Sequence, residues 1–264
     1  MRYSNNPALL TLPILCVLSA LATCWTCIHV AVQKKYVRHT SPFVCMAGAK
    51  HECLLVFRLG GILSCSLYTA STWVWLMAYK ESREAEDEAF SLGPTKWVGP
   101  IMATIASVGF IIMCCFNMYD YSNIHDMAGT VGFTCMSTWG GFLIGSTRDN
   151  NSNTVFAVRL AIYLGSQLSL LLFQGFVQKA AKVKKKYKEN HISDPDTGAA
   201  VDDRSMATLP EGTSHGVSDP SRGNGSDYMT CKPWDNYVTI AAHAEWTALM
   251  FFGFLILTLP VDFM

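Results

Sequence analysis

Residues 97–119 read WVGPIMATIASVGFIIMCCFNMY, a run that contains no charged side chain. A stretch of about 20 apolar residues crosses the roughly 30 Å hydrocarbon layer as a helix, because a helix pairs its own backbone polar groups. Five other segments share this length and character, so we predict six spans. The predicted spans are residues 8–32, 54–79, 97–119, 127–147, 155–178 and 238–260.

The composition also indicates a polytopic membrane protein. Of 264 residues, 50% are hydrophobic and only 15% are charged. The 20 basic and 20 acidic residues cancel, so no basic excess is available to neutralise a phosphate backbone, and we expect no nucleic-acid partner. The predicted fold class is all-α, a bundle of six transmembrane helices. We expect the lipid bilayer to be its partner. We expect the first span to be retained, because it is longer than the apolar core of a signal peptide.

The connection before the last span is much longer than the others. We predict transmembrane helices one to five over residues 1–178, a disordered polar loop rich in Gly, Ser, Asp and Pro over 179–233, and helix six over 234–264. The loop begins with a run of lysines, which either binds anionic lipids or is a solvated helix end. These lysines are Lys179, Lys182, Lys184, Lys185, Lys186 and Lys188.

The residues alone leave the membrane orientation open. Six spans place both termini on one side, and Lys and Arg are more numerous on the opposite side. The positive-inside rule then favours non-cytosolic termini. The sequon Asn224-Gly225-Ser226 lies on that opposite side, and its glycosylation would require the reverse orientation.

Ionisable side chains inside spans cost about 2.5–3.5 kcal/mol each near the bilayer centre, so they usually face the bundle interior. Six ionisable residues lie either inside these spans or at the junction of spans three and four, all toward the side of the longer loops, and we predict a polar cluster there. It would either fix the helix register or form a site for a lipid head group or a regulator. The cluster residues are Arg58, Asp120, His125, Asp126, His243 and Glu245. On the terminal side, Arg159 and Asp262 are predicted to pair.

Catalytic motifs are not evident. The spans carry no His pair at metal-ligand spacing, no nucleophile elbow and no phosphate-binding glycine loop. We therefore expect a protein that is not an enzyme, without catalytic residues, metal or cofactor. Most of the ten cysteines lie in apolar runs, where they act as small hydrophobic residues. Cys45 and Cys53 of the first loop are a candidate disulfide if that loop is luminal, and free thiols if it is cytosolic.

Four short motifs resemble the Frag/DRAM/Sfk superfamily, which includes the damage-regulated autophagy modulators. The last span carries a small-residue stretch, Glu245-Trp246 and Asp262-Phe263, and Arg159 begins the fifth span. The other two motifs are Ser41-Pro42-Phe43 leading to Val56-Phe57-Arg58-Leu59-Gly60, and Asn123-Ile124-His125-Asp126-Met127-Ala128-Gly129.

The resemblance implies a non-enzymatic multipass regulator that promotes autophagy in the endolysosomal system, with cytosolic termini and unidentified membrane or cytosolic protein partners. Its other branches imply two alternatives. One is a plasma-membrane scaffold that supports phosphatidylinositol 4-kinase recruitment and lipid asymmetry. The other is lipid remodelling of GPI anchors in the Golgi.

Overall fold

The computed structural model describes residues 7–34, 43–49, 51–86, 97–118, 120–148, 152–192 and 235–263. Throughout these ranges the regular structure is helical. The elements are α1 (Pro7–Gln33), α2 (Val44–Gly48), α3 (His51–Glu86), α4 (Val98–Cys115), α5 (Ser122–Thr147), α6 (Asn153–Ile192), α7 (Asp235–Leu257) and the 3-10 helix η3 (Leu259–Phe263).

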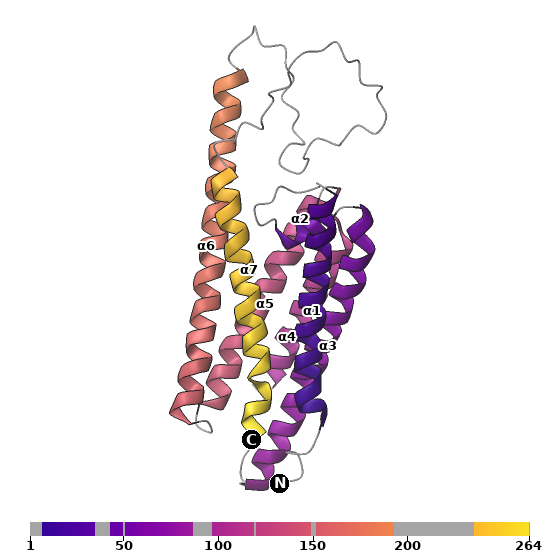
Figure 1. The fold of residues 1–264 in the computed structure, drawn as a ribbon. Coiled ribbons are helices and arrows are strands. Elements are labelled where there is room, and N and C mark those ends of the chain that lie inside the picture. The colour runs from indigo at the N-terminus through magenta and orange to yellow at the C-terminus, as the bar shows by residue number, and fades with distance from the viewer. Residues whose placement is uncertain are drawn as a thin grey trace.

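Six long helices lie side by side in an all-α membrane bundle (Figure 1). Among the described residues, α1, α3, α4, α6 and α7 are long and apolar enough to cross a bilayer. Helix α5 is the sixth long helix, and its many Gly, Ser and Thr residues make it less apolar. It packs against α4 and α6 as part of the same bundle.

Three pairs of helices pack most extensively: α1 with α3, α4 with α5, and α6 with α7. Small residues allow the two helices of each pair to approach closely. Thr23 of α1 occupies the space that a Cβ on Gly60 of α3 would need, and Phe251 of α7 does the same at Gly165 of α6. At Gly109 of α4 the neighbour is the backbone of α5 itself. Small residues in membrane helices allow such contact between backbones.

Several helix ends differ from the predicted span ends. Helix α6 continues to Ile192, so the predicted loop is helical over 179–192, because lysine-rich sequence retains high helix propensity after its hydropathy has fallen. Residues 193–233 of that loop, including the sequon at Asn224, lie outside the described residues. Helix α4 ends at Cys115 and α5 begins at Ser122, so their connection is 116–121 instead of 120–126.

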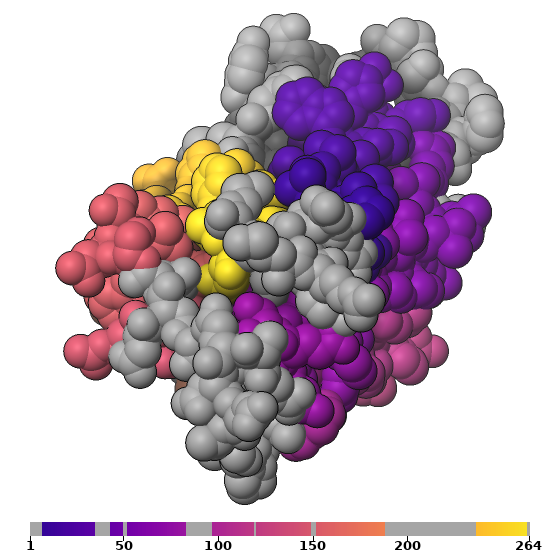
Figure 2. All heavy atoms as spheres, turned by 90° about the horizontal axis from the view of Figure 1, so that it is seen from below, coloured from indigo at the N-terminus to yellow at the C-terminus, as the bar shows by residue number. Residues whose placement is uncertain are grey.

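The start of α1 and the C-terminal η3 lie at one end of the bundle, and α2 lies at the other (Figure 1). Seen along the bundle from the terminal end, the yellow C-terminal residues lie between the salmon α6 and the indigo α1 (Figure 2). The C-terminal segment therefore sits among the helices, where its polar side chains reach several of them.

A Cβ on Gly109 would lie 2.9 Å from the carbonyl oxygen of Ala128 and 3.0 Å from the amide nitrogen of Gly132. Because backbone cannot move aside easily, Gly109→Ala should destabilise the protein by about 1–3 kcal/mol. Thermal unfolding of the purified protein in detergent measures the loss. A Cβ on Gly145 meets nothing within 4 Å, so Gly145→Ala is the matched control. Equal unfolding temperatures for the two variants would contradict the close α4–α5 contact.

Candidate functional site

Two residues of the predicted cluster bind the end of α4. The Arg58 Nη2 group donates to the carbonyl oxygen of Cys115 at 2.9 Å. The His125 Nδ1 atom lies 3.0 Å from the carbonyl oxygens of both Met113 and Phe116. The last carbonyls of a helix lack partners within it, so Arg58 of α3 and His125 of α5 cap α4 from two sides.

Glu245 is buried apart from this cap, with 6% of its surface exposed. Its Oε2 atom accepts a hydrogen bond from the backbone N–H of Val44 at 3.3 Å. Since Val44 begins α2, this contact joins the last helix to the helix that follows α1 in the chain. Neither Arg58 nor any other described cation forms an ion pair with Glu245.

The other three predicted residues, Asp120, Asp126 and His243, are exposed. Asp120 accepts a hydrogen bond from the Asn117 amide at 3.0 Å. The prediction of one six-residue cluster is therefore wrong. Its physical error is angular: successive helical residues point about 100° apart, so His243 cannot face inward together with Glu245, nor Asp126 with His125.

Arg159 and Asp262 are brought together at the terminal end of the bundle. The Arg159 Nη1 group lies 2.7 Å from Asp262 Oδ1, and the two side chains are 1% and 3% exposed. The Trp75 indole N–H of α3 donates to Asp262 Oδ2 at 2.8 Å.

Two threonines take the remaining bonds of this guanidinium. Arg159 Nη1 donates to Thr147 Oγ1 at 3.1 Å, and Nε donates to Thr258 Oγ1 at 3.1 Å. Nη2 donates to the carbonyl oxygen of Thr258 at 2.5 Å. The pair therefore links α3, α5, α6 and the C-terminal segment. The sequence does not mark Trp75, Thr147 and Thr258 as parts of this junction, because hydroxyl and indole groups in a span carry no charge.

Cys45 and Cys53 are both free thiols in the structure, as are the other described cysteines, so the candidate bond between these two stays a prediction. Cys53 faces α1, where its Sγ lies 3.5 Å from the carbonyl oxygen of Cys27. Cys45 lies in α2 near Glu245. Desolvation by burial, followed by the charge of Glu245, raises the pKa of the Cys45 thiol well above its usual range, so this thiol is a poor nucleophile at neutral pH.

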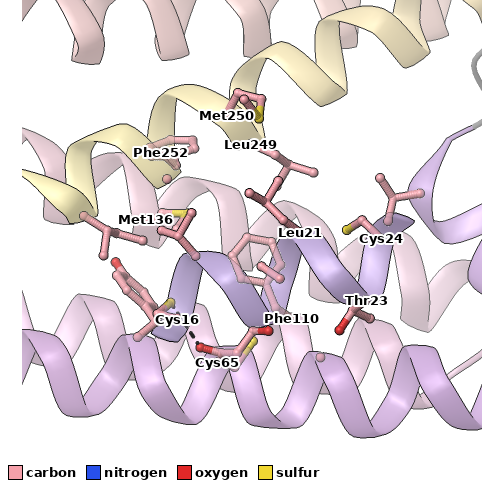
Figure 3. A pocket seen from close by; sticks show the side chains of 18 of the residues that line it. Cys16, Leu21, Thr23, Cys24, Cys65, Phe110, Met136, Leu249, Met250 and Phe252 are labelled. Atoms are coloured by element: carbon pink, nitrogen blue, oxygen red, sulfur yellow. Dashed lines mark hydrogen bonds between the residues drawn. The ribbon is translucent and has the colours of Figure 1, made fainter. Parts of the chain in front are cut away.

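An apolar cavity of about 420 Å³ lies between α1, α3, α4, α5 and α7. Figure 3 shows Leu249 of α7 and Leu21 of α1 lining it, with Phe110 and Met136 from α4 and α5. Glu245 is the one charged residue among its lining residues. The buried hydroxyl of Tyr68, another lining residue, has no hydrogen-bond partner.

The cavity opens sideways, in the direction that lipid would occupy. Exposed apolar side chains of α1 and α7 line it, including Leu18, Leu21, Met250 and Phe254. Contact between α1 and α7 is sparse compared with the three close helix pairs, which leaves the opening. No sequence pattern predicts this cavity, because it is a space between helices that no single helix encodes. Within the described ranges, no three His, Cys, Asp or Glu residues converge as metal ligands.

Replacing Asp262 with Asn leaves the Arg159 charge buried and unpaired, so Asp262→Asn should destabilise the protein by about 3–5 kcal/mol. The unfolding temperature and the yield of monodisperse protein in detergent should both fall. Asp126→Asn makes the same chemical change on an exposed side chain and should leave both values near the wild type. A similar small effect for both variants would show that the buried pair does not hold the bundle.

Comparison with known proteins gave one family match. The model of the Frag1/DRAM/Sfk1/Cwh43P N-terminal domain covers residues 8–264. No curated protein and no solved structure matched the chain. The matched segment runs from α1 to the C-terminal helix and so includes both polar junctions and the cavity. This multipass membrane protein therefore belongs to the Frag1/DRAM/Sfk1/Cwh43P family.

Proposed function

We propose that this protein is a non-enzymatic, lipid-dependent regulator of autophagy in endolysosomal membranes. The observation that carries the proposal is the lateral apolar cavity with the buried Glu245 carboxylate at one end. Membership of the family supports it. The resemblance of the last helix to the autophagy modulators rests on Glu245-Trp246 and Asp262-Phe263, and both acidic residues occupy buried polar junctions.

The dimensions of the cavity suit a single lipid chain. Along α7 it runs from Glu245 to Leu257, a rise of about 18 Å over twelve residues. Half of the hydrocarbon layer is about 15 Å thick. The volume of about 420 Å³ lies in the lower part of the usual range for ligand pockets, about 300–1,000 Å³. A chain from one leaflet would therefore fit, entering between α1 and α7.

Two polar groups in the lining of the cavity would fix the orientation of a bound lipid. Glu245 accepts one hydrogen bond from the protein, through Val44, so a head group that donates an amine or hydroxyl proton would bind its carboxylate. An unpaired buried hydroxyl costs about 1–3 kcal/mol. An acceptor oxygen deeper in the lipid would remove that cost at Tyr68.

The same contacts supply a route to regulation. Glu245 joins α7 to α2 and thereby to the first loop. Since α1 and α7 touch sparsely, a lipid between them replaces the missing protein contacts. A lipid bound in the cavity would then determine how α2 packs against the bundle. A luminal or membrane partner would bind the surface formed by α2.

Filling the cavity should abolish lipid binding. A Cβ on Gly253 has its nearest neighbours at 3.8 Å, on Val17, so the larger side chain of Gly253→Leu would project into the space beside α1. Photo-crosslinking with a diazirine fatty acid incorporated into cellular lipids should label α1 and α7 of the wild type several-fold more than those of this variant. Gly175→Leu places the same side chain where nothing lies within 4 Å and should label like the wild type. Equal labelling of all three proteins would remove the proposed binding site.

Loss of the carboxylate should impair the regulatory role. In cells that lack the endogenous protein, tagged wild type should localise to lysosomes and restore autophagic flux, and Glu245→Gln should localise there with reduced flux. Glu81→Gln, an exposed control, should restore flux fully. Location at the Golgi with loss of GPI-anchored proteins in the deficient cells would instead support anchor remodelling. Full flux with Glu245→Gln would contradict the role given to the cavity.

A second candidate function, the plasma-membrane scaffold, is favoured by the shape of α6. Its 40 residues correspond to about 60 Å, twice the hydrocarbon thickness. Lys182, Lys185 and Lys186 are exposed on the extension, three and four residues apart and hence on one face. Such a face would attract anionic head groups if this end is cytosolic. Protease protection of a tag placed in 193–233 tests that condition, since cleavage of the tag by protease added to intact cells would place this end outside the cytosol and exclude the scaffold arrangement.

A further inference from the structure

We infer that Cys27 and Cys53, which are free thiols in the structure, become oxidised to a disulfide that links α1 to α3. Each thiol reaches the backbone of the other residue: Cys53 Sγ lies 3.5 Å from the carbonyl oxygen of Cys27, and Cys27 Sγ lies 3.9 Å from that of Cys53. A disulfide needs Cβ atoms about 3.5–4.5 Å apart with side chains facing each other. These reciprocal contacts place both thiols in the α1–α3 interface, each directed at the other residue.

Neighbouring contacts hold the two helices close at this level. Thr23, one turn before Cys27, fills the space that a Cβ on Gly60 would need. At the other side of the cysteine pair, Lys34 and Glu52 form an ion pair of 3.3 Å. The cysteines therefore lie between two contacts that fix the register of α1 against α3. Formation of the bond would then proceed by rotation of the two side chains within this fixed register.

Burial determines when the bond would form. Cys27 and Cys53 are 0% and 1% exposed, so an oxidant reaches them only before the helices have packed. A disulfide of a thiol oxidoreductase or of oxidised glutathione would accept the two electrons. The two cysteine thiols lose two protons, one sulfur–sulfur bond forms between them, and the oxidant's disulfide becomes two thiols. This exchange belongs to the lumen of the secretory pathway, and the cytosolic termini that the family resemblance implies would put the first loop there.

The geometry also separates this pair from the other cysteines. Cys45 lies on α2 near Glu245, whereas Cys53 faces α1. Cys16 makes a comparable contact across the α1–α3 interface, with its Sγ 3.4 Å from the carbonyl oxygen of Ser64. It lies eleven residues before Cys27, about 16 Å deeper along α1, where a soluble oxidant does not reach. Cys16 therefore serves as an internal reference that stays reduced.

A bond at this position would divide the bundle into a fixed and a movable part. Helices α1 and α3 supply the cavity wall that faces α7. Covalent linkage keeps this wall constant, so a change in cavity width would come from α7 and its Glu245 contact. The linkage itself follows from the cysteine geometry and does not depend on the proposed function.

Peptide mapping of the full-length protein tests the inference. Membranes are lysed in N-ethylmaleimide, the protein is denatured in the same reagent, and its peptides are analysed without reduction. We expect a linked peptide pair containing Cys27 and Cys53, with Cys16 and Cys45 alkylated. Alkylation of both Cys27 and Cys53 in most of the protein would overturn the inference, as would a Cys45–Cys53 link.

Variants provide a second readout in the same assay. Cys45→Ser should retain the Cys27–Cys53 link, and Cys27→Ser should leave Cys53 alkylated. If Cys27→Ser does not accumulate, the wild-type map and the Cys45→Ser map decide the question. Loss of the link in Cys45→Ser would show that Cys45 takes part in the bond and would contradict the assignment.

Discussion

A guanidinium group without access to water governs the terminal end of this bundle. Arg159 is 1% exposed, and a charge in hydrocarbon must find acceptors within the protein. It finds them in Asp262, Thr147 and Thr258, and Asp262 in turn receives the Trp75 indole. One cation thereby fixes four parts of the chain relative to each other. The C-terminal segment is held among the helices for the same reason.

The loop-rich end is built differently, and its looser construction leaves room for a ligand. Arg58 and His125 bind the carbonyl end of α4, and neither forms an ion pair with Glu245. Glu245 is left with a single backbone donor from α2, beside an apolar space that opens toward the lipid. A firm terminal end and a cavity that begins at Glu245 toward the other end together suit a membrane protein that responds to a lipid. This contrast is the physical basis of the proposed regulator.

Much of the fold follows from hydropathy, because long apolar runs have few alternatives in a membrane. The depth of Arg159 and Asp262 also placed them within reach of each other. Depth along the helix axis does not give the direction in which a side chain points around the helix. Depth alone therefore groups His243 with Glu245, although the two side chains point to different sides. Arg58 is predicted to belong to the same cluster, and it binds a helix-end carbonyl instead. The cavity depends on sparse contact between α1 and α7, which no local pattern records.

The most direct test of the account is the number of lipids that remain bound to the purified protein, measured by native mass spectrometry after gentle removal of detergent. We predict one tightly held lipid per chain. This lipid should dissociate more readily from Glu245→Gln, in which an amide replaces the carboxylate. A chain that carries no retained lipid, or a set of lipids unaffected by that replacement, would contradict the claim that the cavity with Glu245 is the functional centre of the protein.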